Sequence, residues 1–430
     1  MACDREAFRF IRMHQPEFNT LGRRIELMNL AAAVCSAVVM SWLLLPGKTP
    51  AAENAPGIST TEIKIGSTFP LSGPASAFAN TGKGLVAYVD ALNERGGVGG
   101  RKIKLVVLDD AYSPPKAVEQ TRKLVEDDEV AFIYSAIGTP SNAATIKYLN
   151  ARKVPDLFIV SGASRFSNFR EFPFTTTALP SFDTEGRIYA KYVSENFSRD
   201  RIAILYQNDD LGKDFVNAFK AHFGEEFANK VTALSYEISD PTIDSQIVNL
   251  RASGAGVFLV AGTPKFTAQA IRKSHELNWK PQIIINLVSS SIATTLRPAG
   301  LDISVGIISA TYYKDPGDPK FSDDPGVALF KQVMGRFAAN ADLFDINYIT
   351  GYNQGAILEQ VLKQCGDDLS RENVMKQARS ITDFAPPMAI PGILVNTDEN
   401  NSQAITQLQL QKWDGAGWRT FGSVVGATAR

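Results

Sequence analysis

The alternation of short β-branched runs with helical periodicity is the feature that most constrains the fold of this chain. A first strand is predicted over residues 63–69, and apolar residues then recur at helical spacing until Gly96 and Gly97 end the helix. Further strands are predicted over residues 103–108, 130–134 and 157–160, separated by helical stretches at 115–125 and 141–149. Repetition at this pace predicts parallel βαβ units and a sheet covered by helices on both faces.

The same pattern restarts after residue 180 and predicts a second α/β set. Its strands are predicted over residues 202–206, 231–236, 257–261, 282–285 and 305–310. Three helical stretches follow, at 327–337, 346–364 and 371–378. The tail changes character, because residues 403–411 alternate and residues 413–418 form a hairpin turn before a last strand. The fold class predicted is therefore α/β with two mostly parallel sheets.

Composition narrows the classes of function. The 430 residues are 44% hydrophobic and 21% charged, which is ordinary for a globular protein with two or three domains. The formal net charge is −1, so there is no basic excess that would hold nucleic acid or an acidic membrane by bulk attraction. We expect no nucleic-acid partner.

The N-terminus resembles an export signal. Arg23 and Arg24 precede an apolar run over residues 31–45, and small residues end the segment at Ala52. We expect a leader over 1–52, cleaved near Ala52, and a periplasmic mature protein. An uncleaved anchor is the alternative, and Met28 is an alternative start. Only one of the three cysteines lies beyond the leader, so no internal disulfide is expected.

Catalytic apparatus is missing from the sequence. The chain has no Gly-x-Ser-x-Gly, Gly-x-x-x-x-Gly-Lys, Cys-x-x-Cys or His-Glu-x-x-His motif. His222 and His275 lie on separate predicted helices without ligand spacing, and the several Asp pairs fall at turns and helix ends where Asp is a normal cap. We expect no catalytic residue, no metal site and no cofactor.

Several motifs together resemble one family. They are the strand and Ser72-Gly-Pro74 turn that open the soluble part, Gly96-Gly-Val-Gly-Gly-Arg101, Asp109-Asp110 before a proline, Val154-Pro155 before Ser161, and Ile390-Pro-Gly-Ile-Leu394. In these the chain resembles the type I solute-binding proteins of ABC importers, in the branched-chain amino acid (leucine/isoleucine/valine) family. The resemblance covers essentially all of 58–425. It implies a two-lobe fold with a three-crossing hinge, lobe one at 58–181 plus 309–391 and lobe two at 182–308 plus 392–430.

Two loops of lobe one are the predicted anion site. Gly138 and small hydroxyl residues lead directly into a helix, where free N–H groups and hydroxyls favour a carboxylate, although any helix needs such a cap. The loop at 161–164 lies at the equivalent end of the next predicted strand. In the family these two loops hold the ligand carboxylate, which implies ligand-binding roles for five residues: Gly138, Thr139, Ser141, Ala163 and Ser164.

The other predicted ligand contacts also come from the resemblance. Phe78 matches an aromatic residue that covers the ligand, with core packing as the alternative. In lobe two, Leu211 matches a position that is commonly tyrosine and Thr263 lies in a loop that commonly carries an aromatic residue. Phe182 stands where the family often has Asp, and as a buried aromatic it also fits the core.

The predicted ligand follows from a difference between this chain and the family. Amino-acid binders of the family need an acidic group in lobe two for the α-ammonium, and the matching stretch, Asn286 to Ser289 around Val288, contains no carboxylate. This favours an aromatic or aliphatic carboxylate without an amine. A branched-chain amino acid is the alternative, and it would require Asp183 or Glu185 to reach the cleft. Amides, urea-like or other small polar solutes form a third class.

The leading function is delivery of this ligand to the membrane permease of an ABC importer by hinge closure of a monomer. A sensory ligand-binding subunit on the same fold is the alternative. An exported hydrolase would need a nucleophile and base that the sequence does not offer.

Overall fold

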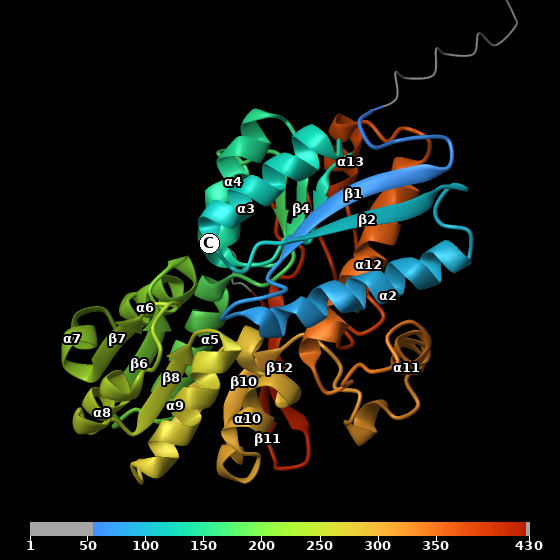
Figure 1. Ribbon diagram of the computed structural model, residues 1–430. Helices are drawn as coiled ribbons and strands as arrows, with labels where there is room; N and C mark the ends of the chain where they lie inside the picture. The colour runs from blue at the N-terminus through green and yellow to red at the C-terminus, as the bar shows by residue number, and fades with distance from the viewer. Residues whose placement is uncertain (1–54, 427–430) are drawn as a thin grey trace, which may run out of the picture. The chain divides into compact units, whose positions relative to one another are not determined.

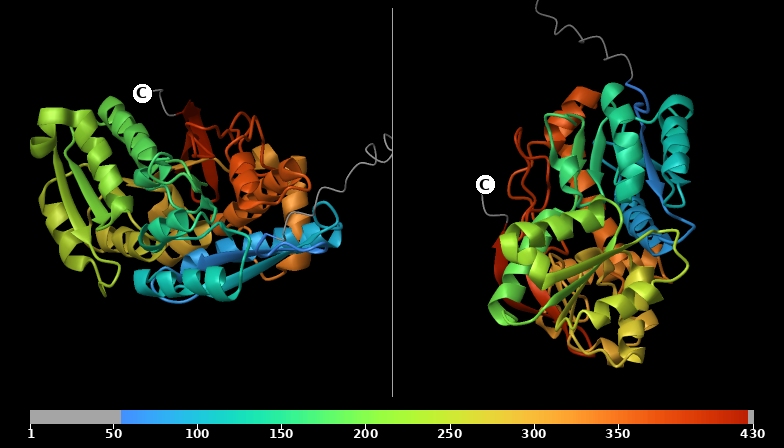
Figure 2. Two further views of the ribbon diagram at one scale, coloured as in Figure 1. Left: turned by 90° about the horizontal axis from the view of Figure 1, so that it is seen from above. Right: turned by 90° about the vertical axis from the view of Figure 1, so that its left-hand side faces the viewer.

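A computed structural model describes residues 55–426 of the chain (Figure 1). The predicted leader, 1–52, lies outside the described residues. Within the described range, no helix is long and apolar enough to cross a membrane. The described residues form two sheets, each flanked by helices, as Figures 1 and 2 show. This confirms the α/β class predicted from the alternation of strands and helices.

Lobe one is built on a five-stranded sheet in the order β2-β1-β3-β4-β5. All of its strand pairs are parallel. The strands are β1 (Glu62–Phe69), β2 (Lys102–Asp109), β3 (Ile133–Tyr134), β4 (Asp156–Ile159) and β5 (Thr175–Thr177). The helices of lobe one are α2 (Ala79–Glu94), α3 (Pro114–Arg122), α4 (Thr139–Ala151), α11 (Pro325–Phe337), α12 (Ile346–Cys365) and α13 (Arg371–Ala378), of which α11 packs on α2 and α13 on α12.

Lobe two is built on a seven-stranded sheet in the order β12-β11-β10-β9-β8-β6-β7. The parallel strands are β6 (Ile202–Gln207), β7 (Val231–Tyr236), β8 (Val257–Ala261), β9 (Gln282–Ile285) and β10 (Ile308–Thr311), and the antiparallel ones are β11 (Gln407–Trp413) and β12 (Trp418–Gly426). Its helices are α5 (Phe182–Asn196), α6 (Asp210–Phe223), α7 (Phe227–Lys230), α8 (Asp244–Ala252), α9 (Pro264–Glu276) and α10 (Arg297–Ala299).

The chain passes three times between the two sheets. The passages follow β5, follow β10 and precede β11. The proposed change of lobe at residue 309 falls inside β10, which pairs with β9 and β11 in the second sheet. Near the third passage, Thr177 of β5 forms an isolated bridge to Gln403.

Two strand predictions for lobe one are corrected by the structure. The strand expected over 130–134 is reduced to Ile133–Tyr134, because the carbonyls of Val130 and Ala131 accept hydrogen bonds from the Arg371 guanidinium instead of a neighbouring strand. The strand β5 was not expected. Its Thr176 hydroxyl oxygen accepts a hydrogen bond of 2.8 Å from the N–H of Phe158, so a side chain helps to join it to β4.

Helices α2 and α12 lie side by side although they are far apart in the sequence (Figure 1). Their backbones meet at glycines. A β-carbon on Gly351 would overlap the carbonyl of Thr81, and one on Gly84 would overlap the carbonyl of Tyr348. This close approach lets two long helices cover one face of the first sheet. The start of α2 is thereby fixed beside the loop that follows β1.

A buried carboxyl group lies within the first sheet. Asp156 of β4 is 0% exposed, and neither of its carboxyl oxygens has a hydrogen-bond partner among the described residues. Burial raises the pKa of this group to about 7. The carboxyl group therefore keeps its proton at pH values where an aspartate in water is ionised.

Asp156→Asn is expected to flatten the dependence of stability on pH. An unfolded aspartate ionises near pH ~4, whereas the folded group holds its proton until about pH 7. The unfolded state therefore binds fewer protons in this window, and the free energy of unfolding falls as pH rises through it. Urea unfolding at pH 5 and pH 8 should show the wild type losing more stability than the variant, by an amount on the order of a few kcal/mol. Equal losses in the two proteins would contradict this account.

Candidate functional site

The loops that follow the parallel strands of lobe one gather at one edge of its sheet. Strands β1, β2, β3 and β4 end at Phe69, Asp109, Tyr134 and Ile159. The carboxyl ends of parallel strands meet at the same edge, which is where open α/β sheets bind ligands. The loops after β1, β2 and β4 are joined to each other or to lobe two by the hydrogen bonds described below.

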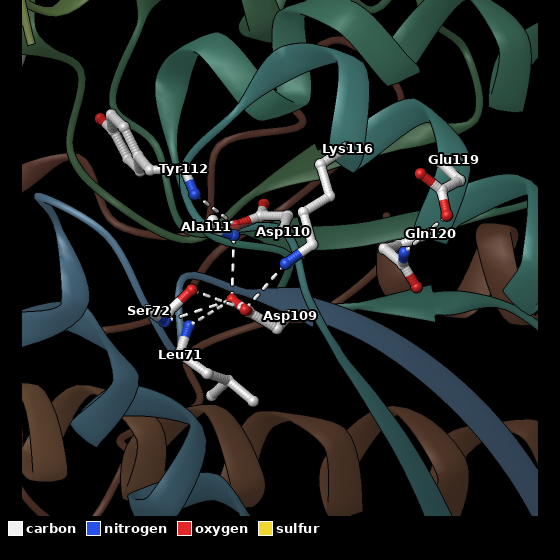
Figure 3. Close-up of polar contacts among 9 residues, drawn as sticks. All are labelled: Leu71, Ser72, Asp109, Asp110, Ala111, Tyr112, Lys116, Glu119 and Gln120. Atoms are coloured by element: carbon white, nitrogen blue, oxygen red, sulfur yellow. Dashed lines mark hydrogen bonds and ion pairs between the residues drawn. The ribbon is translucent and has the colours of Figure 1, made fainter. Parts of the chain in front are cut away.

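Asp109 ties the first two loops together (Figure 3). Its Oδ1 accepts hydrogen bonds from the N–H groups of Leu71, Ser72 and Ala111 at 2.9, 3.2 and 2.9 Å. Its Oδ2 accepts from the Ser72 hydroxyl at 2.7 Å and pairs with the Lys116 ammonium at 2.9 Å. Burial acts to raise the pKa of Asp109, but the hydrogen bonds from Lys116 and Ser72 lower it below its usual value. Asp109 thus serves as an anchor for two loops.

The predicted anion site at the start of α4 has the expected backbone. Gly138 has a φ of +110°, which favours glycine, and its N–H donates to the Val160 carbonyl at 3.3 Å. The Thr139 hydroxyl is 2.8 Å from the hydroxyl of Ser161, which connects the two predicted loops. The Ser141 hydroxyl helps to lower the pKa of Asp110, although burial raises that pKa overall. The two loops predicted to share a ligand are therefore brought together.

The loop after β4 already holds a carboxylate, and that carboxylate comes from lobe two. The N–H of Ser164 donates to Asp214 Oδ2 at 2.7 Å, and its hydroxyl donates to Oδ1 at 3.0 Å. The next residue, Arg165, pairs with Asp210 at 3.1 Å. Ala163 is buried beside them, and its N–H donates to the Ser161 hydroxyl at 3.3 Å. The two lobes are in contact at this loop.

The two predicted aromatic contacts lie in different surroundings. Phe78 ends the 3-10 turn η1 (Ser76–Phe78), and its ring centroid is 6.5 Å from that of Tyr112 in the neighbouring loop. Phe182 is 2% exposed and packs against Phe215 at 5.8 Å between ring centroids. Its ring also fills the space beside Gly162. Phe78 thus lies among the strand-end loops of lobe one, whereas Phe182 is a core residue packed against Phe215 and Gly162.

The lobe-two candidates lie at the ends of three parallel strands. Leu211 is buried, and its N–H donates to Asp209 Oδ1 at 2.9 Å. The N–H of Thr263 donates to the Tyr236 hydroxyl at 3.1 Å. Val288 is partly buried in the short turn η5 (Leu287–Ser289) after β9. Leu211 lies in the first turn of α6, whereas Thr263 and Val288 lie in the connections that follow β8 and β9.

Sequence reasoning missed a polar network beside these candidates. The Tyr236 hydroxyl is 3.2 Å from Gln207 Oε1, and Gln207 Nε2 donates to Asp209 Oδ2 at 2.6 Å. Burial raises the pKa of Asp209 to about 6. The residues are dispersed over two strands and a helix start, so no local motif marks them. Gln207 and Asp209 are neighbours in sequence, and the parallel pairing of β6 and β7 brings Tyr236 to them.

A buried carboxyl group does contact the loop at 286–289. Glu185 of α5 is 1% exposed, and its Oε1 accepts hydrogen bonds from the Leu287 N–H at 2.6 Å and from the Tyr189 hydroxyl at 2.7 Å. Burial raises its pKa to about 7. Asp183, in contrast, pairs with Arg187 at 2.8 Å. The sequence signal for Glu185 was its spacing of four from Tyr189, which places the two side chains on one face of a helix.

A groove of about 610 Å³ lies beside α2. It is lined mainly by apolar side chains of α2 and of the segment after α11, together with Leu71 and Lys83. None of the predicted site residues lines it. In the part of the chain that the structure describes, no group of three or more His, Cys, Asp or Glu side chains is arranged to hold a metal ion.

Two α/β sheets with loops gathered at the carboxyl ends of their strands have the arrangement in which open α/β sheets bind ligands. A family model described as periplasmic binding protein matches residues 62–417. The chain belongs to this periplasmic binding protein family, which is a family of substrate-binding proteins.

Relatives agree with this assignment. Leu/Ile/Val-binding protein homolog 7 of Brucella abortus is 23% identical over 370 residues, covering 83% of this chain and 90% of that protein. A branched-chain amino acid ABC transporter structure from Thermus thermophilus with bound valine has a TM-score of 0.76 at 14% identity, covering 86% and 98% of the two chains. A fatty acid ABC transporter substrate-binding protein from Thermomonospora curvata has a TM-score of 0.73 at 18% identity, covering 87% and 95%. The two structures share the fold of this chain.

Asp109→Asn is expected to lower the free energy of unfolding at pH 7 by about 1–3 kcal/mol, because an anionic acceptor of several hydrogen bonds is lost. The lowered pKa means that this contribution is present above the usual aspartate pKa of about 4 and is lost as pH falls. Urea unfolding should therefore show a difference that narrows at pH 3. The exposed Asp127, changed to Asn, is the control. Equal effects of the two substitutions at pH 7 would contradict the anchoring role.

Proposed function

We propose that this protein is the extracytoplasmic solute-binding component of an ABC importer, and that its ligand is a small aromatic or aliphatic carboxylate. The ligand would bind between the lobes, and the membrane permease would recognise the closed form. Membership of the periplasmic binding protein family supports the class. Two relatives described as ABC transporter proteins, one with bound valine and one for fatty acids, support transport of a small carboxylate.

The way Ser164 binds Asp214 is the observation that carries the carboxylate proposal. A main-chain N–H and a hydroxyl of one residue donate to the two oxygens of one carboxylate, at 2.7 and 3.0 Å. Charge-assisted hydrogen bonds of this kind are about twice as strong as neutral ones. The adjacent start of α4 adds the favourable end of a helix dipole. Lobe one therefore carries donors suited to an anion, and in this structure Asp214 occupies those of Ser164.

The carboxylates near the lobe-two candidates support a ligand without an ammonium group. Asp209 is already hydrogen-bonded to Leu211 and Gln207, and Glu185 to Leu287 and Tyr189. Burial raises both pKa values, to about 6 and about 7. An α-ammonium needs a charged acceptor when it is buried. Both groups already accept hydrogen bonds from protein donors, and Glu185 carries reduced charge near neutral pH, so an amine-free acid fits better.

A branched-chain amino acid is the second candidate. The Brucella relative is named for leucine, isoleucine and valine, and the Thermus structure holds valine. Glu185 is the group that would favour this candidate, because its carboxyl touches the loop at 286–289. Its ionisation on binding would supply the missing charge.

A thermal-shift screen distinguishes the two candidates. The protein, exported from the full chain and purified, would be mixed with pairs that differ only in the amine: leucine with 4-methylpentanoate, and phenylalanine with 3-phenylpropanoate. A ligand at ~100 times its Kd adds about 2.7 kcal/mol of stability, a clear shift. We expect shifts with the acids, and none with the amino acids or with the neutral amides of the acids. Shifts with leucine or valine alone would contradict the carboxylate proposal.

Ser141→Ala is expected to weaken binding of the acid by about 5–10-fold, the worth of about one hydrogen bond. Its hydroxyl lies in the first turn of α4, beside Gly138. Thr145→Ser is the matched control, because Thr145 lies one turn further along α4 and its hydroxyl donates to the Ser141 carbonyl. Isothermal titration calorimetry gives the Kd of each variant. An unchanged Kd for Ser141→Ala would remove this residue from the site.

A further inference from the structure

Tyr112 is the largest side chain presented by the strand-end loops of lobe one, and none of the predicted ligand contacts includes it. It follows β2 in the loop anchored by Asp109, and its side chain is directed away from that aspartate (Figure 3). Only 4% of the residue is exposed. A tyrosine on a loop that leads out of a sheet is expected to be half-exposed, so its burial requires neighbours from another part of the molecule.

The backbone that presents Tyr112 has an unusual conformation. Ala111 and Tyr112 have φ angles of +51° and +59°, and two successive left-handed residues that are not glycine are uncommon. Two aspartates hold this turn, because the N–H of Ala111 donates to Asp109 Oδ1 and the N–H of Tyr112 donates to Asp110 Oδ1, both at 2.9 Å. The carboxyl groups of Asp109 and Asp110 thus fix the direction of the Tyr112 side chain.

On the lobe-one side, the ring of Tyr112 lies against the start of α4. A β-carbon on Gly138 would be 2.7 Å from Cε2 and 3.0 Å from Cδ2 of this ring, so only glycine leaves room for it. The ring centroid of Phe78 is 6.5 Å away on another side. Two aromatic rings therefore form a wall beside the predicted carboxylate donors.

On the other side, Tyr112 faces the polar network of lobe two. Burial raises the pKa of the Tyr112 phenol well above its usual value, and the nearby Asp209 adds to the rise. Hydrogen bonding to Gln207 and to the backbone of Thr139 acts to lower the pKa of the phenol. The hydroxyl therefore lies between a donor group at the start of α4 and an amide at the end of β6, where the two lobes meet.

We infer that Tyr112 is a specificity-determining residue of the cleft: its ring limits the body of the ligand to a short or flat shape, and its hydroxyl binds the ligand's polar end. This inference rests on the proposed function and names the class of acid more narrowly. In this inference a flat acid of the size of benzoate stacks beside the rings of Tyr112 and Phe78, which lie 6.5 Å apart between centroids. A long flexible acid would have to pass through the space that the Tyr112 ring fills.

The test compares a short and a long acid in three proteins exported from the full chain. The Kd values of benzoate and octanoate are measured by calorimetry for the wild type, Tyr112→Ala and Tyr112→Phe. The wild type is expected to prefer benzoate. Tyr112→Ala should shift the ratio of the two Kd values by at least tenfold towards octanoate. Tyr112→Phe should keep the ratio and weaken benzoate binding by roughly 3–10-fold, the worth of about one hydrogen bond.

Tyr134→Phe is the matched control. Tyr134 is buried in the same sheet, and its hydroxyl donates to the carbonyl of Gln354 at 2.6 Å, so its loss lowers stability without a change in the cleft. The ratio of Kd values should stay at the wild-type value in this control. A Tyr112→Ala protein that weakens both acids by the same factor would show a structural role only and would overturn the inference.

The outcomes also separate this inference from the proposed function. If the wild type binds acids but neither Tyr112 variant changes the ratio or the affinity, the inference is wrong and the proposed function stands. If the wild type binds none of the acids and binds leucine or valine instead, the carboxylate proposal fails and the inference fails with it. Tyr112→Phe, which keeps the buried ring, provides the comparison if Tyr112→Ala does not fold.

Discussion

The parallel pairing of β1, β2, β3 and β4 brings four loops to one edge of the first sheet, and β6, β8 and β9 do the same in the second. Loops at such an edge carry main-chain N–H groups and polar side chains that need partners. Some of these groups find their hydrogen-bond partners in the other lobe, as Ser164 does with Asp214. Contact between the lobes and the proposed affinity for an anion thus have the same chemical origin.

The proposed hinge closure is compatible with this arrangement. The chain passes between the sheets three times, so the lobes can rotate about short connections while each sheet keeps its own core. A ligand favours the closed form only if it makes contacts there that it lacks in the open form. We propose that donors on lobe one and the network around Gln207 and Asp209 on lobe two supply such contacts. In our proposal Tyr112 bridges both sides.

The sequence was sufficient for the class of fold and for the loops of lobe one. Periodicity located most strands, and the glycine and hydroxyl residues at Gly138–Ser141 marked a helix start that the structure confirms. Lobe two was harder, because Tyr236 meets Gln207 and Asp209 only through strand pairing. Glu185 was recognised as near the site, but its hydrogen bond to Leu287 joins residues 102 apart in sequence. Local patterns cannot encode such contacts, and the direction of Tyr112 depends on a rare backbone conformation.

The central claim is that a carboxylate binds at the start of α4 between the two lobes. A crystal structure of the exported protein with its tightest-binding acid tests this most directly. The account predicts carboxylate oxygens within about 3 Å of the N–H groups or hydroxyls of Thr139, Ser141 or Ser164. A ligand that binds elsewhere, or one whose ammonium group pairs with Glu185 or Asp209, would contradict it.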